Sequence, residues 1–100
     1  MTDTYEAMEI LEIDEAATEE DEIRALQHLV NTGQWSWPGR TGRAMMDAIE
    51  AGYVALGLES AIDYYGNRIP SRLEVEAGTK GSVEFVAEHS PYGLLEENDV

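Results

Sequence analysis

The chain has 100 residues, of which 43% are hydrophobic, so it allows a single small core of limited depth. It carries 21 acidic against 6 basic residues, a net charge of −15, which excludes nucleic acid as the main partner. No stretch is apolar and long enough for a membrane span, the N-terminus lacks a signal-peptide pattern, and cysteine is absent. These features predict a protein of the cytoplasm.

The charge is distributed unevenly along the chain. Residues 1–22 hold ten acids and no base, residues 23–57 carry a balance of +1, and residues 58–100 carry −6. We therefore divide the chain into two parts. Residues 1–57 are predicted to form an acidic helical part with a tryptophan and arginine loop. Residues 58–100 are predicted to form a short helix and an extended or hairpin tail that packs on the first part.

Two helices are predicted near the N-terminus, over about 4–13 and 19–31, because no glycine or proline occurs between Asp3 and Thr32. Thr18 and Asp21 have the spacing of a capping box, which places a helix start between them, although one long helix is the alternative. Gly33 offers a C-terminal cap. The residues expected on the apolar faces are Tyr5, Met8, Ile10 and Leu11 in the first helix, and Ile23, Leu26, Leu29 and Val30 in the second.

A third helix is predicted from a cap at Thr41 to about Ala51, after a loop over 34–42, and Gly52 ends it. Its buried face is predicted to consist of Met45, Met46, Ala48 and Ile49. Residues 53–56 are a short apolar run that fits a strand or a final helical turn. Residues 58–65 fit one more short helix, which Gly66 stops.

The C-terminal third has two interpretations. Alternation in 73–76 and 83–85 predicts a hairpin, whereas Ser82 at a cap position predicts a short helix over 83–89. Residues 91–100 read as a tail held by Tyr92, Leu94 and Leu95. The expected fold class is mainly α, with about three N-terminal helices and an extended C-terminal third that has room for one β-hairpin (α+β).

Acidic residues three apart form the first candidate site. On a helix, three residues span ~4.5 Å, which is close to the ~3.4 Å between successive phosphate charges on one DNA strand. The row therefore predicts a nucleic-acid mimic that occupies a basic groove on another protein; a solvated helix face is the alternative. The expected partner-binding residues are Glu6, Glu9, Glu12, Glu15, Glu19 and Glu22.

The loop before the third helix is the second candidate site. It combines indole rings with guanidinium groups, a hydroxyl and glycines at a helix N-terminus, where an anion or a partner protein can bind. In the alternative interpretation, a tryptophan anchors the loop on the core and the arginines pair with surplus carboxylates. The residues concerned are Trp35, Trp37, Arg40, Thr41 and Arg43.

Other chemistry has little support in the sequence. His28 and His89 are isolated from each other, and no calcium-loop pattern or nucleophile elbow is present. We therefore predict no metal site, no cofactor and no enzymatic activity. The methionines, Met8, Met45 and Met46 among them, are expected to fill the core.

Two segments carry a resemblance to a known group of proteins. LQHLVNTGQWSWPGRTGRAMMDAIEAG (26–52) and YGNRIPSRLEVEAGTKGSVEFV (65–86) resemble small proteins of tailed phages, a family of unassigned function. In that family, a tryptophan loop leads into Gly-Arg and a helix that closes in Glu-Ala-Gly. The resemblance implies a phage protein that acts in the host cytoplasm. Small acidic phage proteins of this kind include inhibitors of restriction, of CRISPR effectors and of transcription.

Three functional hypotheses follow. The first is an interaction protein that docks on a basic surface of a host protein through its acidic face and inhibits it. The second is a phosphate- or nucleotide-binding module at the 39–43 loop. The third is a structural component of the virion, for which an oligomer is possible in principle.

Overall fold

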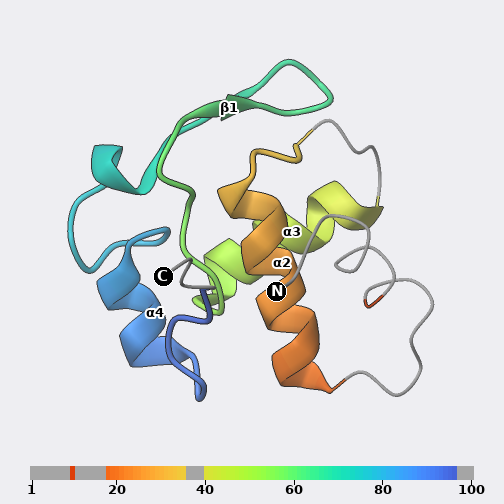
Figure 1. Ribbon diagram of the computed structural model, residues 1–100. Helices are drawn as coiled ribbons and strands as arrows, with labels where there is room; N and C mark the ends of the chain where they lie inside the picture. The colour runs from red at the N-terminus through yellow and green to blue at the C-terminus, as the bar shows by residue number, and fades with distance from the viewer. Residues whose placement is uncertain (1–9, 11–17, 36–39, 97–100) are drawn as a thin grey trace.

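The computed structural model describes residues 10, 18–35 and 40–96. In these residues, three α-helices, one short 3-10 helix and one two-stranded hairpin follow in the order α2, α3, β1, β2, η1, α4 (Figure 1). The fold class is therefore mainly α with a small β component, as predicted. The predicted helix over 4–13 lies outside the described residues except for Ile10, which is helical and packs against the core. None of the described helices combines the length and the apolar character that crossing a bilayer requires.

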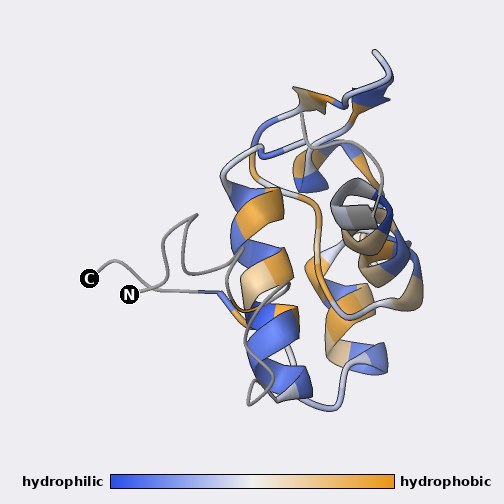
Figure 2. Ribbon diagram, turned by 90° about the vertical axis from the view of Figure 1, so that its right-hand side faces the viewer, coloured by the Kyte–Doolittle hydropathy of each residue, from blue (hydrophilic) through white to orange (hydrophobic). Residues whose placement is uncertain are grey.

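Helix α2 (Glu19–Asn31) begins at the predicted capping box. The Thr18 hydroxyl accepts a hydrogen bond from the Asp21 backbone N–H, and the Asp21 carboxylate accepts one from the Thr18 N–H, both at 3.1 Å. Thr18 has an extended backbone, so no helix runs through it. The predicted helix start at Glu19 is therefore confirmed, and the alternative of one long helix is wrong. The four apolar residues predicted for this helix are all buried. Figure 2 shows the hydrophilic first turn of α2 and the apolar residues in its later turns.

Helix α3 (Arg40–Ala51) packs against α2. It begins one residue before the predicted cap, so Thr41 lies in the first turn and its assignment as the cap was wrong. Arginine is a stronger helix former than threonine, and cap signals alone leave helix ends uncertain by a residue or two. Met45, Ala48 and Ile49 are buried as predicted, Met46 is half-buried, and Gly52 ends the helix.

The helix predicted over 58–65 is wrong. This segment instead contains β1 (Ala61–Ile62), which pairs antiparallel with β2 (Arg68–Ile69) in the register Ala61↔Ile69 and Ile62↔Arg68. The helical spacing of the apolar residues was misleading, because Leu58, Ile62 and Tyr65 are all exposed and make no buried face. The Asp63 carboxylate accepts hydrogen bonds from nearby backbone N–H groups, which favours a turn between the strands over a helix.

The C-terminal third forms a helix instead of the hairpin. Helix α4 (Val83–His89) begins at Ser82, whose hydroxyl accepts a hydrogen bond from the Phe85 N–H at 3.1 Å. The predicted alternation at 73–76 does not mark a strand, because η1 (Arg72–Glu74) occupies it and Leu73 is exposed. The hairpin interpretation of this region was therefore wrong, and the capped-helix alternative is confirmed.

Residues 53–57, which we call the connecting segment, follow α3 and belong to neither a strand nor a helix. Val54, Ala55 and Leu56 are buried. The Gln27 side chain, itself fully buried, bonds to both backbone groups of Ala55. Its Oε1 accepts from the Ala55 N–H at 2.8 Å and its Nε2 donates to the Ala55 carbonyl at 2.9 Å. One amide side chain thus satisfies both backbone groups of the buried Ala55, while the next N–H, that of Leu56, donates to the Gly81 carbonyl at 2.9 Å.

Arg72 fixes the end of the same segment. Its Nε donates to the Leu56 carbonyl at 2.7 Å, and its guanidinium pairs with Glu96 at 2.8 Å and reaches Asn31 at 3.2 Å. Asn31 is in turn bonded to Gln27 and to Glu96. The end of α2, the connecting segment and the chain near Glu96 are therefore joined by one polar network. The connecting segment then leads to the hairpin.

Candidate functional site

The acidic row is only partly within the described residues. Glu6, Glu9, Glu12 and Glu15 lie outside them, whereas Glu19 and Glu22 lie in the first turn of α2 and are exposed. Glu19 accepts a hydrogen bond from the Tyr92 hydroxyl at 3.4 Å. Its neighbour Glu20 forms an ion pair with Arg24 at 3.0 Å. Of the acids in this turn, Glu22 has no side-chain hydrogen bond or ion pair with another described residue.

The residues of the tryptophan and arginine loop separate into different environments. Trp37 lies outside the described residues, and Arg40 begins α3. Trp35 is 3% exposed and belongs to the core cluster, which confirms for this indole the alternative that it anchors the loop. Thr41 is half-buried and Arg43 is exposed, and neither forms a salt bridge or side-chain hydrogen bond within the described part of the chain.

A feature that the sequence did not reveal lies beside this loop, at the turn of the β1–β2 hairpin. We call residues 63–67 the tyrosine tip. The Asp63 carboxylate accepts hydrogen bonds from the backbone N–H groups of Tyr65 at 2.9 Å and Asn67 at 2.8 Å. Gly66 has φ +87°, a left-handed conformation that a side chain would strain. The turn is therefore held in one shape by its own residues.

These hydrogen bonds lower the pKa of the Asp63 carboxyl below its ordinary value. The Asn67 backbone N–H has the largest effect, partial desolvation opposes it, and the Asn67 side chain and the backbone N–H groups of Tyr65 and Gly66 add to the lowering. Each donor stabilises the ionised form over the protonated form. Asp63 is therefore negatively charged at neutral pH.

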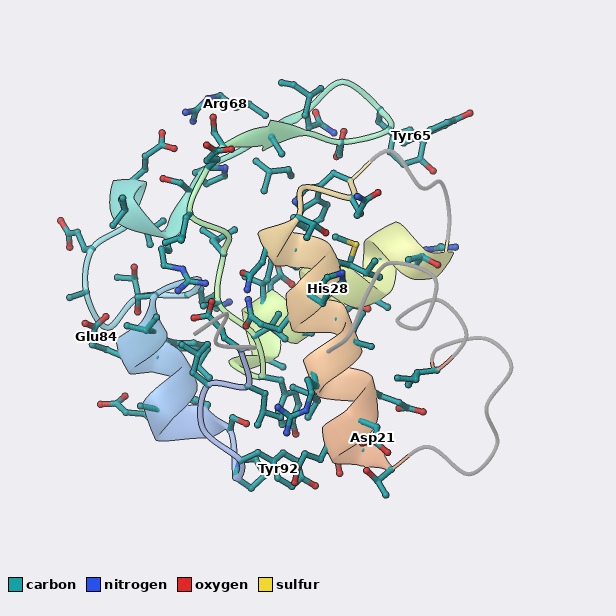
Figure 3. The ribbon with its side chains drawn as sticks, viewed as in Figure 1. Asp21, His28, Tyr65, Arg68, Glu84 and Tyr92 are labelled. Atoms are coloured by element: carbon teal, nitrogen blue, oxygen red, sulfur yellow. The ribbon has the colours of Figure 1, made fainter. Side chains whose placement is uncertain are left out.

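The tip and the chain leading to it expose several large apolar side chains. Leu58, Ile62, Tyr64 and Tyr65 are between 57% and 72% exposed, although they lie within eight residues of one another. The rings of Tyr64 and Tyr65 meet edge to face, with centroids 5.2 Å apart and planes at 87°. Figure 3 shows Tyr65 at the outer end of the hairpin. Exposed apolar groups gathered in this way are typical of a protein-binding surface.

A pocket of about 220 Å³ separates the tyrosine tip from the start of α3. Trp35, Gly42, Arg43 and Met46 line one side, and Asp63, Tyr64 and Tyr65 line the other. The structure thus brings Trp35 and Arg43, two of the predicted loop residues, together with the tip. In contrast, the first turn of α2 lies at the opposite end of the molecule, as the positions of Asp21 and Tyr65 show (Figure 3).

The size and charge of the pocket limit what it can bind. Pockets for drug-sized ligands and cofactors usually measure about 300–1,000 Å³, and a cavity of about 150 Å³ already holds a benzene ring. The pocket therefore matches one large side chain better than a nucleotide. Its two charged lining residues, Asp63 and Arg43, are of opposite sign, so the lining gives no net preference for an anion such as phosphate.

The described residues offer no grouping for a metal ion. No three His, Asp or Glu side chains in them lie close enough together to ligate one. The Nε2 atom of His28, on α2, is shielded from solvent and has no hydrogen-bond partner among the described residues, but a single imidazole does not form a ligand set.

The comparisons with known proteins give no relative from which a function could be transferred. No protein-family model, curated protein or solved structure matches this chain. The functional assignment therefore depends on the residues described above.

Proposed function

We propose that the protein is a small interaction protein that docks on another protein through the tyrosine tip. The observation that carries this proposal is the exposure of four large apolar side chains on and beside a turn that its own hydrogen bonds hold rigid. Tyrosine supplies a large contact area at low entropic cost, and a preformed loop loses little freedom on binding.

The charge of the chain specifies the kind of partner. A net charge of −15 repels acidic proteins and accelerates encounter with a basic surface at low salt. In the phage setting that the sequence resemblance implies, the partner is a host protein with a basic surface, and docking inhibits it. The acidic row, including Glu9, Glu12 and Glu15, would extend this contact as a nucleic-acid mimic and steer the approach.

The test uses the host protein that the wild-type chain captures from a lysate at low salt. Its affinity is measured by calorimetry for the wild type, for Tyr64→Ser/Tyr65→Ser, and for Leu73→Ser as a matched control. Leu73 is 79% exposed and does not line the pocket near the tip. Its replacement therefore tests whether the loss of any exposed apolar side chain weakens binding. We expect the double variant to bind at least tenfold more weakly and the control to bind as the wild type does.

Two results would count against the proposal. Equal affinity of the double variant and the wild type would mean that the tip is not the contact surface. The triple change Glu9, Glu12 and Glu15 to Lys tests the charge separately, because it should weaken binding and reduce its salt dependence. Unchanged affinity of this triple variant would remove the acidic row from the interface.

A further inference from the structure

The pocket beside the tyrosine tip has a lining that selects one class of side chain. The lining includes Trp35, Arg43, Met46, Tyr64 and Tyr65. Each of these residue types has a favourable contact with an aromatic ring. Indole and phenol rings stack or meet it edge to face, a thioether sulfur lies at its edge, and a guanidinium stacks on its face.

The geometry leaves space for such a ring at the start of α3. Gly42 has no side chain, so the helix surface is open where the pocket begins, and Trp35, 3% exposed, forms part of its buried wall. Tyr64 and Tyr65 already form an edge-to-face pair at 5.2 Å, to which a third ring can be added. A volume of about 220 Å³ accommodates a single aromatic side chain.

We infer that this pocket receives one aromatic side chain of the partner protein, carried next to basic residues. The aromatic ring follows from the lining. The basic neighbours follow from the charge of the chain as a whole, which is −15, because Asp63 and Arg43 in the pocket lining offset each other. This inference rests on the proposed docking function and names the contact at its centre.

A second hollow of similar size provides an internal control. It has a volume of about 240 Å³ and lies beside η1 and α4, where it is lined by Arg72, Leu73, Val75 and Val83 among others. None of its lining residues is aromatic. An aromatic probe should therefore discriminate between the two hollows, whereas a probe that binds any apolar surface should not.

The experiment titrates the full-length protein with two peptides, acetyl-Lys-Phe-Lys-amide and acetyl-Lys-Ala-Lys-amide, and records NMR shifts of assigned methyl and amide groups. We expect the Phe peptide to shift the Met46 methyl and the Tyr65 amide, and to bind at least about tenfold more tightly than the Ala peptide. The Val75 and Val83 methyls should not move. Tyr65→Ser should weaken the effect at Met46, whereas Leu73→Ser should not.

The peptides also separate failure of this inference from failure of the proposed function. If both peptides shift only exposed acidic residues and Met46 does not move, the pocket inference is overturned, while docking of the tip on a basic partner is tested independently by affinity. A Met46 signal that changes on dilution of the protein alone would assign the pocket to a second copy. If the Trp37→Ala substitution changes the Met46 signal in the absence of peptide, the pocket would be assigned to the chain's own Trp37. Either result overturns the inference.

Discussion

Replacing Gln27 with leucine should strongly destabilise the protein, although the change removes only one polar side chain. This side chain is fully buried and makes two hydrogen bonds to the Ala55 backbone and one to Asn31. Leucine has a similar size but satisfies none of them, so the buried N–H and C=O of Ala55 lose their partners. Each unpaired buried group costs about 1–3 kcal/mol.

The expected loss of unfolding free energy is about 2–4 kcal/mol, because the apolar leucine offsets part of the cost. For a domain of this size, such a loss lowers Tm by roughly 10–30 °C. The loss is measured by urea denaturation followed by circular dichroism. Gln34→Leu is the matched control, because Gln34 is half-buried and its side chain makes no hydrogen bond to another described residue. If Gln27→Leu is no more destabilising than the control, the role given to Gln27 is wrong.

Acid, a tightly packed glycine and salt should each change stability in a defined direction. The folded pKa of Asp63 lies below the unfolded value of about 3.9, so its stabilisation of the tip is complete at neutral pH and is lost as pH falls through the folded pKa. The Asn67 amide shift should follow this loss in wild type and stay constant in Asp63→Asn. Gly81→Ala should destabilise the fold by ~2 kcal/mol or more, because its Cβ would lie 2.5 Å from a Leu56 side-chain atom. The control Gly78→Ala should cost less, because Gly78 has a similar φ but no atom near its added Cβ. Equal losses of stability for the two variants in urea denaturation would contradict the clash. Raising the salt concentration from about 0.01 to 0.5 M should raise Tm in calorimetry, because it screens repulsion among the surplus carboxylates. A Tm that falls with salt would show that attractive ion pairs dominate.

The position of α2 followed from local signals that the structure confirms. The Thr18 capping box started α2 where the sequence placed it, and the apolar spacing identified its buried face. These signals depend on residues within one or two turns, so they do not require knowledge of the rest of the fold.

The helix prediction for the segment after Leu58 failed because the residues at helical spacing are not buried. Ile62 and Tyr65 are exposed, and the turn is determined by the Asp63 side chain and by Gly66. The sequence Asp63-Tyr64-Tyr65-Gly66-Asn67 does contain residues typical of a turn, which was the signal that could have located the hairpin.

The candidate site was predictable only in part, because its two walls, residues 35–46 and 63–65, are far apart in the chain. The sequence indicated that Trp35 and Arg43 stand near each other in a loop. Nothing local could indicate that the tyrosine tip would lie opposite them, or that Gln27 would bond to the backbone of Ala55. Such contacts depend on tertiary packing, which outweighs local preference.

Hydrogen exchange on the complex with the protein captured from a lysate would test the proposed docking surface residue by residue. We predict that binding slows exchange of the amides in the tyrosine tip and in the first turns of α3, around Gly42 and Met46. Exchange in α4 should stay as it is in the free protein. Slowed exchange confined to α4 and η1, with the tip unaffected, would contradict the proposed function.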